Sequence, residues 1–166
     1  QFFQGLTAAA YEYGVDIVGS DLTSAQQVTV TVTVTGFSLL KKQLHLRSQA
    51  KAGDFILVTG SLGASAAGLW LSLNPQAQQQ VSNAADLLKA HFRPQARVKE
   101  ALFLAKHGCE ALADISDGLA RDMTNICLAS GVGCLIEEEN LPLAKGVAEV
   151  ARLSGKTATT VALSGG

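Results

Sequence analysis

The sequence has little net charge and no long hydrophobic run. Its 166 residues carry a formal net charge of −1, so no general electrostatic attraction draws the chain to nucleic acid or to an anionic membrane. No apolar run reaches the length of a membrane span, and the N-terminus lacks the basic-then-apolar pattern of a signal peptide. We therefore expect neither a nucleic-acid partner nor a membrane partner.

Motifs for disulfides, zinc and common nucleotide loops are also lacking. The cysteines are odd in number and show no C-x-x-C spacing, which favours reduced thiols in a cytoplasmic protein: Cys109, Cys127 and Cys134. The histidines are scattered without ligand spacing, which argues against a zinc site: His45, His91 and His107. The glycine loop at 59–63 lacks the G-K-[ST] of a P-loop and the G-x-G-x-x-G of a dinucleotide site, so we interpret it as a tight turn.

The sequence does contain enough apolar residues, 48%, to bury a core in one compact domain or in pieces of two. Predicted strands alternate with predicted helices from residue 55 onward, which indicates α/β or α+β layers. The predicted helices cover residues 2–13, 64–73, 76–90, 94–107, 119–130 and 144–153. The predicted strands cover residues 15–18, 28–35, 55–58, 111–113, 133–136 and 159–163.

Residues 28–35 give the clearest pattern, an unbroken alternation of Val and Thr that stops at Gly36. This predicts a half-buried strand with Val facing inward and Thr facing outward. The Thr face could pair with another sheet or another subunit, or it could be a solvated sheet face. The pattern leaves both open.

Two carboxylates and a hydroxyl lie close together in residues 113–119, A-D-I-S-D-G-L, where a predicted strand passes into a predicted helix. Ser116 or Asp117 can cap that helix, and Gly118 gives the backbone room to turn. A helix N-terminus favours anions, but a phosphate there would meet Asp114 and Asp117 as like charges unless a cation lay between them. Mg²⁺ fits that role because it binds a few carboxylates together with phosphate oxygens.

Two simpler interpretations stand beside this magnesium–phosphate hypothesis. Asp and Ser are common helix caps, and on these seven residues alone an ordinary helix start is favoured. Gly19-Ser20-Asp21 follows another predicted strand, and an acidic residue after such a turn can hold a metal. Asp is also an ordinary turn residue, so that interpretation is favoured for Asp21 taken alone.

Several motifs occur in a fixed order along the chain: Gly19-Ser20-Asp21, Arg47 in R-S-x-A-K-x-G-D, T-G-x-L-G-x-S-A-A-G-L at 59–69, R-P-x-x-R at 93–97, D-I-S-D-G-L at 114–119, and A-L-S-G-G at 162–166. Together they resemble thiamine-monophosphate kinases, members of the superfamily of aminoimidazole ribonucleotide synthetase and selenide, water dikinase. The resemblance covers essentially the whole chain. D-I-S-D-G-L is typical of the kinase rather than of its relatives, which favours the magnesium–phosphate interpretation.

The resemblance implies a role for each matching residue. Asp21, Asp114 and Asp117 would bind Mg²⁺. Ser20 would lie beside the nucleotide phosphates, Ser116 would contact ATP, and Arg47 would reach the nucleotide phosphates. The implied enzyme is a phosphotransferase that moves the γ-phosphoryl group of ATP onto the phosphate of thiamine monophosphate. Mg²⁺ ions would neutralise and align the two polyanions, and no protein nucleophile is needed.

The resemblance also implies an α/β, or α+β, fold made of two halves. Residues 1–40 would end the N-terminal half, which binds ATP and forms a barrel-like dimer interface. Residues 41–166 would belong to the C-terminal half, a mixed sheet with helices. The Val/Thr strand would lie at or near the interface, which favours a homodimer.

The chain departs from the family pattern at Ser20, where a second Gly is usual, at residues 22–24, and at Ala64, where Asp is usual. It begins inside a predicted helix and stops at two glycines, so the sequence indicates the middle of a longer protein. The family's N-terminal acidic loops and its thiamine-recognising residues are absent, so we expect this stretch alone to turn over poorly. The alternatives are a non-catalytic remnant that binds Mg²⁺-nucleotide or only dimerises, and another ATP-using enzyme of the superfamily.

Overall fold

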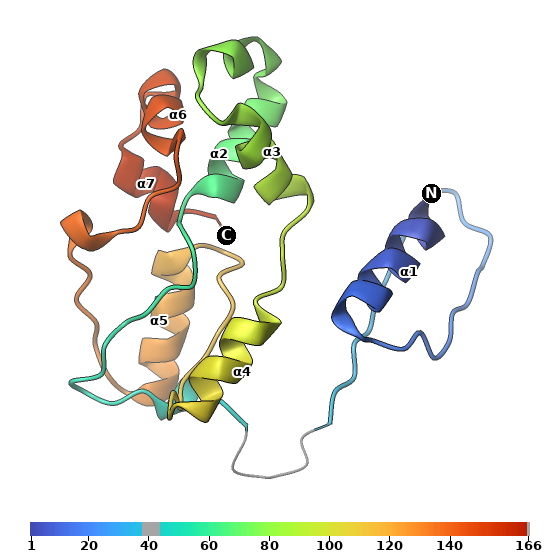
Figure 1. Cartoon of the computed structure of the whole chain (residues 1–166), viewed down its shortest axis with the longest axis horizontal. Helices are drawn as coiled ribbons and strands as arrows, with labels where there is room; N and C mark the ends of the chain where they lie inside the picture. The colour runs from blue at the N-terminus through green and yellow to red at the C-terminus, as the bar shows by residue number, and fades with distance from the viewer. Residues whose placement is uncertain (38–43, 166) are drawn as a thin grey trace. The chain divides into compact units, whose positions relative to one another are not determined.

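The computed structural model describes residues 1–37 and 44–165, which fall into two units, Gln1–Phe37 and Ser38–Gly166 (Figure 1). The predicted boundary between residues 40 and 41 lies outside the described residues and stays a prediction. No helix in the described ranges is long and apolar enough to cross a membrane.

The first unit contains one helix, α1 (Phe2–Tyr13), as predicted. Gly14 ends it in the left-handed conformation, with φ of 64°. Residues 15–37 then form irregular chain, so the predicted strands at 15–18 and 28–35 have no ladder hydrogen bonds. The valines at alternate positions of the second segment are all exposed, by 52% to 97%: Val28, Val30, Val32 and Val34. The inward-facing Val side of the predicted strand is therefore not covered within this unit.

The regular secondary structure in the described residues of the second unit is helical, apart from one isolated bridge. Four helical elements come first along this unit. They are η2 (Arg47–Gln49), α2 (Ala64–Leu73), η3 (Pro75–Gln80) and α3 (Ala84–Phe92). The later elements are α4 (Val98–Lys106), α5 (Leu119–Ser130), η4 (Glu138–Asn140), α6 (Val147–Ser154) and α7 (Ala158–Leu163). The predicted bounds of α2 and α5 are confirmed, and Gly131 and Gly155 end α5 and α6 as expected.

The predicted strand at residues 159–163 is wrong, because this segment is helix α7. The Thr157 hydroxyl caps the helix by accepting a hydrogen bond from the Thr160 N–H at 3.1 Å. The Ser164 hydroxyl donates to the Thr160 carbonyl at 2.6 Å near the other end. These local hydrogen bonds, together with burial of Val161 and Ala162, outweigh the preference of Thr and Val for strands.

Three predicted helices have different bounds. The helix predicted at 144–153 is α6, which begins at Val147 and ends at Ser154. The helix predicted at 76–90 is divided into η3 and α3, because Asn83 takes a left-handed conformation with φ of 58° between them. The helix predicted to open at Pro94 begins only at Val98. The predicted strands at 55–58, 111–113 and 133–136 are irregular chain, so the sheet stays a prediction. The described residues contain a single parallel bridge, between Leu62 and Leu143.

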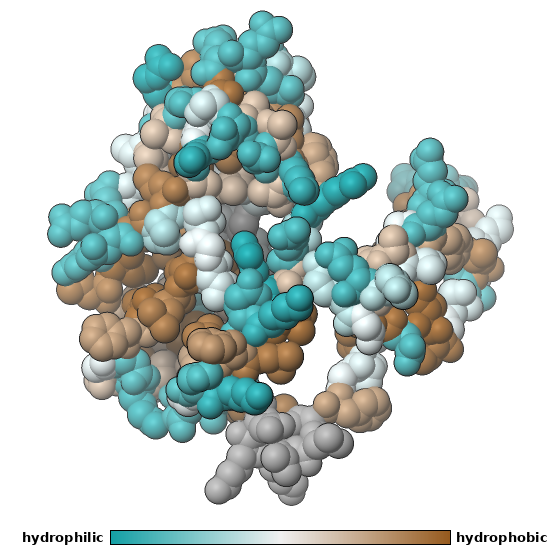
Figure 2. Space-filling view, viewed as in Figure 1, coloured by the Kyte–Doolittle hydropathy of each residue, from teal (hydrophilic) through white to brown (hydrophobic). Residues whose placement is uncertain are grey.

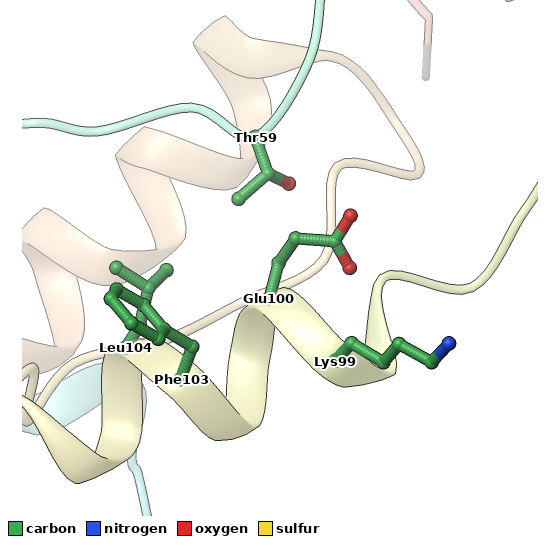
Figure 3. Close-up of a pocket in the computed structure, with 5 residues that line it drawn as sticks. All are labelled: Thr59, Lys99, Glu100, Phe103 and Leu104. Carbon is green, nitrogen blue, oxygen red and sulfur yellow. The ribbon is translucent and has the colours of Figure 1, made fainter.

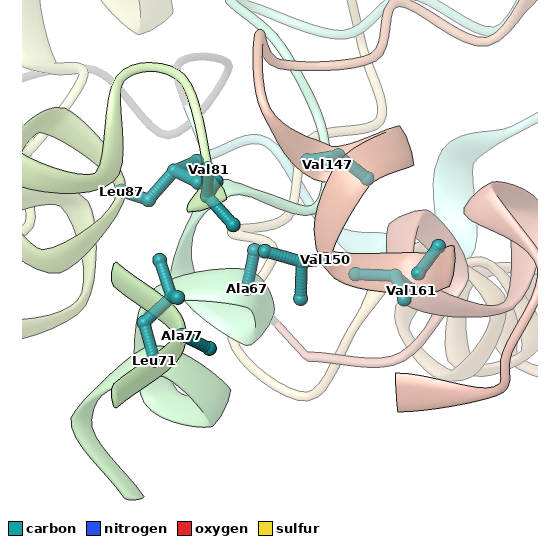
Figure 4. Packing of buried hydrophobic residues seen from close by; sticks show 9 residues of the cluster. Ala67, Leu71, Ala77, Val81, Leu87, Val147, Val150 and Val161 are labelled. Atoms are coloured by element: carbon teal, nitrogen blue, oxygen red, sulfur yellow. The ribbon is translucent and has the colours of Figure 1, made fainter. Parts of the chain in front are cut away.

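The main hydrophobic core lies between α2, α3, α6 and α7 (Figure 4). Leu71, Leu87, Val147 and Val150 are its largest fully buried side chains. Gly68 lets α2 and α3 approach closely, since a β-carbon there would lie 2.1 Å from the Leu87 carbonyl oxygen. A second, smaller cluster packs beneath the start of α5 and consists of Leu62, Leu119 and Ala162 with their partly buried neighbours.

Apolar side chains also lie on the surface of the second unit, where Figure 2 shows hydrophobic groups between polar ones. They include residues of the two apolar segments that were predicted as strands, such as Phe55 at 92% exposure and Leu135 at 82%. Without a paired sheet, segments that are apolar on both faces remain exposed.

Glu149, near the start of α6, joins this helix to the turn between η3 and α3. Both the backbone N–H and the hydroxyl of Ser82 donate to its carboxylate, the hydroxyl at 2.7 Å. These hydrogen bonds favour the ionised form and hold the pKa of Glu149 below its ordinary value of 4.5.

We expect Ser82→Ala to reduce the acid sensitivity of the fold. A carboxyl whose pKa is lower in the folded state contributes stability above its unfolded pKa, and this stability is lost as the pH falls through the folded value. Urea unfolding at neutral pH and at a pH below 4.5 measures the difference for each protein. Ser72→Ala is the matched control, because the Ser72 hydroxyl donates to the Leu69 carbonyl instead. Equal pH dependence in Ser82→Ala and the control would contradict the expectation.

Candidate functional site

The candidate site is the loop at residues 114–118 that leads into α5. Ile115 and Leu119 pack into the smaller hydrophobic cluster with Leu62 and Ala162. The residues between and beside these anchors, Asp114, Ser116 and Asp117, are exposed. The alternation of apolar and polar residues therefore fixes the loop to the core and presents two carboxylates and a hydroxyl to solvent.

The predicted capping of α5 by Ser116 or Asp117 is wrong. Gly118 is the residue before the helix, and no side chain caps the first turn from that side. Instead Asp122, within the first turn, reaches back to the loop. Its Oδ2 atom accepts the backbone N–H of Ser116 at 3.0 Å and that of Asp117 at 3.1 Å.

Sequence reasoning missed Asp122, although a signal was present. It lies one helical turn after Leu119 and beside Met123, on the apolar side of α5. An acidic residue at such a position needs hydrogen-bond donors, and free N–H groups are found at the start of a helix.

The loop also contacts the segment that follows α7. The Gly165 N–H donates to the Asp117 carbonyl at 3.3 Å. Gly118 has φ of 108° and ψ of 151°, and a β-carbon on it would lie 2.4 Å from the Gly165 nitrogen. The D-I-S-D-G-L motif and residues 164–165, far apart in the sequence, thus meet backbone to backbone. The chain after α7 passes close to the start of α5 (Figure 1).

Arg47 reaches the site because Ser130, at the end of α5, holds the short helix η2. The Ser130 hydroxyl donates to the Arg47 carbonyl at 2.7 Å and accepts the Ala50 N–H at 3.1 Å. The Arg47 guanidinium then lies 3.6 Å from Asp114 Oδ1. The structure therefore brings together two residues that the sequence analysis assigned to the site, 67 positions apart, although each side chain is at least half exposed (51% and 74%).

Asp117 has an arginine neighbour of its own. Arg121, in the first turn of α5, places its Nε atom 3.4 Å from Asp117 Oδ2. Both carboxylates of the loop are therefore paired with exposed guanidinium groups. Such pairs contribute little to stability, so a stronger cation or a phosphate can replace either partner at small cost.

Ser20 and Asp21 belong to the first unit, and both are exposed. The Asp21 carboxylate accepts the N–H of its neighbour Leu22 at 2.9 Å, which is a local turn contact. Their place in a shared site with Asp114 and Asp117 stays a prediction.

The residues of the loop fit Mg²⁺. Asp114 and Asp117 supply two exposed carboxylates from one loop, and Mg²⁺ is usually held by one or two carboxylates together with phosphate oxygens and water. Within the described part of each unit, His, Cys, Asp and Glu side chains nowhere gather in groups of three that could hold a metal ion.

A shallow depression of about 410 Å³ lies along α4 (Figure 3). Thr59, Lys99, Glu100, Phe103 and Leu104 line it. None of the residues predicted for the site is among them, so the depression is distinct from the loop at 114–118.

Comparison with known proteins places this geometry in a family. Residues 51–159 match the family described as AIR synthase related protein, C-terminal domain. The chain belongs to this family. The matched range of the AIR synthase related domain includes the whole loop and all of α5, and it supports the superfamily fold without defining the sheet.

The resemblance to thiamine-monophosphate kinases is confirmed. The chain is 40% identical over 143 residues to the thiamine-monophosphate kinase of Bacillus subtilis, covering 85% of this chain and 44% of that protein. It is 31% identical over 166 residues to that of Aquifex aeolicus, covering 100% and 53%. A solved structure described as AaThiL complexed with AMPPCP and TMP matches with a TM-score of 0.61 and 35% identity over 72% of this chain and 38% of that one. The chain thus spans about half the length of these relatives.

Proposed function

We propose that the complete protein is a thiamine-monophosphate kinase, which uses ATP and Mg²⁺ to convert thiamine monophosphate to thiamine diphosphate. The observation that carries the proposal is the loop at 114–118, which presents Asp114 and Asp117 beside Arg47 and Arg121. A solved relative is described as a complex with AMPPCP, an ATP analogue, and TMP, which supports both substrates. Carboxylates for a metal and guanidinium groups for phosphates are the groups that phosphoryl transfer needs.

Each residue has a defined part in this proposal. Bound Mg²⁺ would neutralise and align the phosphates. Asp114 and Asp117 would hold it, and Arg47 would bind phosphate oxygens once its Asp114 partner turned to the metal. The Ser116 N–H is already donated to Asp122, so a contact with ATP falls to the Ser116 hydroxyl. The γ-phosphorus forms a bond to a phosphate oxygen of thiamine monophosphate as its bond to ADP breaks, without a protein nucleophile.

The first unit completes the proposal. Asp21 would add a carboxylate for Mg²⁺, and Ser20 would lie beside the nucleotide phosphates. The exposed valines of the Val/Thr segment support a homodimer, because an uncovered β-forming stretch is a ready pairing surface for a second copy. The three cysteines are free thiols, which supports a cytoplasmic protein.

The experiment is turnover by the complete gene product, with ATP and thiamine monophosphate, with and without Mg²⁺, followed by chromatography of thiamine diphosphate. We expect Mg²⁺-dependent product formation, and none when unphosphorylated thiamine replaces the monophosphate. Nucleotide binding without turnover would favour the non-catalytic alternative. ATP consumption with only another acceptor would favour a different enzyme of the superfamily.

A further inference from the structure

Asp122 is the only charged residue that is buried in the described part of the chain, at 5% exposure. Burial of a carboxylate is costly unless hydrogen bonds replace the lost water. Here two backbone N–H groups of the loop donate to one carboxylate oxygen, Oδ2. A hydrophobic residue would fill the same place in α5 without that cost. The carboxylate is therefore explained by its hydrogen bonds to the loop and not by packing within α5.

The two donors fix the loop at the residues that matter for the site. The carboxylate sets the peptide groups that precede Ser116 and Asp117, and hence the directions in which these two side chains leave the backbone. On the other side of Asp117, its carbonyl accepts the Gly165 N–H at 3.3 Å. Asp117 is therefore held at both of its peptide groups, by Asp122 and by the segment after α7.

Gly118 packs closely against the chain at the end of α7. A β-carbon there would lie 2.5 Å from the Leu163 carbonyl oxygen as well as 2.4 Å from the Gly165 nitrogen. The backbone at Gly118 is thus buried against the chain at the end of α7, while the carboxylate of the neighbouring Asp117 stays 55% exposed. The backbone is held by hydrogen bonds and close contacts while the functional group stays accessible, which is the arrangement that preorganises a metal ligand.

We propose that Asp122 is a positioning residue that holds Asp117 in the orientation needed to bind the Mg²⁺-nucleotide, without touching the metal itself. This inference rests on the proposed function for its ligand. In this inference the buried carboxylate affects Mg²⁺-nucleotide binding by holding the loop. In a purely structural role it would affect only the stability of α5.

The test compares Asp122→Ala and Asp122→Asn in the complete gene product. Asp122→Asn keeps an acceptor oxygen, whereas Asp122→Ala removes both. Asp86→Asn is the matched control, since Asp86 is also an acidic residue in the first turn of a helix, α3, but is exposed. Amide hydrogen exchange without ligand measures the two N–H groups directly, and calorimetry measures the Mg²⁺ concentration at which an ATP analogue is half bound.

We expect Asp122→Ala to accelerate exchange at Ser116 and Asp117 by about 10- to 100-fold, in line with the loss of hydrogen bonds to a charged acceptor. We expect its half-saturating Mg²⁺ concentration to rise by about 10- to 100-fold, the usual effect of removing a group that orients a metal ligand. Asp122→Asn should fall between Asp122→Ala and the unaltered protein, and Asp86→Asn should match the unaltered protein. If Asp122→Ala does not fold, Asp122→Glu, which keeps the charge but displaces the oxygens, carries the same test.

Unchanged exchange at Ser116 and Asp117 would overturn the inference, as would faster exchange with an unchanged Mg²⁺ requirement. Failure of the proposed function has a different signature. In that case the unaltered protein itself binds no Mg²⁺-nucleotide, and Asp122 then has no role in metal binding. The exchange rates still decide whether Asp122 holds the loop.

Discussion

In the complete gene product, Asp117→Asn is expected to lower kcat/KM for the proposed Mg²⁺-dependent phosphorylation of thiamine monophosphate by more than about 100-fold, because replacement of groups that merely orient a metal ligand already costs 10- to 100-fold. The amide that replaces the carboxylate carries no charge, so it binds Mg²⁺ poorly and leaves the phosphates less neutralised. The backbone of Asp117 keeps its hydrogen bonds to Asp122 and Gly165, so the loop should keep its shape.

Stability separates this effect from misfolding. The substitution breaks the exposed ion pair between Asp117 and Arg121, whose side chains are 55% and 73% exposed. Pairs of this kind, one helical turn apart, contribute about 0.3–0.5 kcal/mol. The unfolding midpoint in urea should therefore change little while turnover is lost.

Glu100→Gln is the matched control for Asp117→Asn. Glu100 makes a similar exposed ion pair at the start of another helix, α4, with Arg97 at 3.3 Å. Both substitutions remove one negative charge and one surface pair, but only Asp117 lies in the loop at 114–118. The assignment of Asp117 would be wrong if both variants kept full turnover, or if both lost it equally.

Gly118→Ala is expected to destabilise the second unit strongly and to abolish activity. Its φ of 108° and ψ of 151° belong to a region that is essentially limited to glycine, with a cost of about 1–3 kcal/mol for other residues. The added β-carbon would also meet the backbone of Gly165 and Leu163 within 2.5 Å, and overpacking of this kind costs about 1–3 kcal/mol more. Neither contact can be relieved by turning a side chain.

Gly131→Ala, at the other end of α5, shows how much of this loss comes from backbone conformation alone. Gly131 also has a positive φ, 67°, but a β-carbon on it would have no atom within 4 Å. Its substitution should cost only about 1–2 kcal/mol, the penalty for a left-handed residue. Urea unfolding of both variants provides the comparison, and equal losses would show that the close approach between the loop and the end of α7 does not contribute.

The elements that were predicted well are those whose signals are local. Residues 2–13, 64–73 and 119–130 combine an apolar face with a clear end, and in the first and last of these a glycine takes the left-handed conformation immediately after the helix. Helix α7 was missed because its signal lies in hydroxyl hydrogen bonds of Thr157 and Ser164, which compete with a β-branched composition.

The part of the site that was predicted from the sequence is also the part that is local in the chain. Asp114, Ser116 and Asp117 stand together in the sequence, so their proximity follows from the chain itself. The approach of Arg47 depends on the Ser130 hydroxyl, and the frame of the loop depends on Asp122 and Gly165. Such contacts between distant segments leave no periodic pattern.

The central claim is that the loop at 114–118 is the Mg²⁺-nucleotide site. Calorimetric titration of a non-hydrolysable ATP analogue into the complete gene product, with and without Mg²⁺, tests it most directly when Asp117→Asn is titrated alongside. The account predicts binding that requires Mg²⁺ and that Asp117→Asn loses. Binding of equal affinity in both proteins, or binding that is indifferent to Mg²⁺, would contradict it.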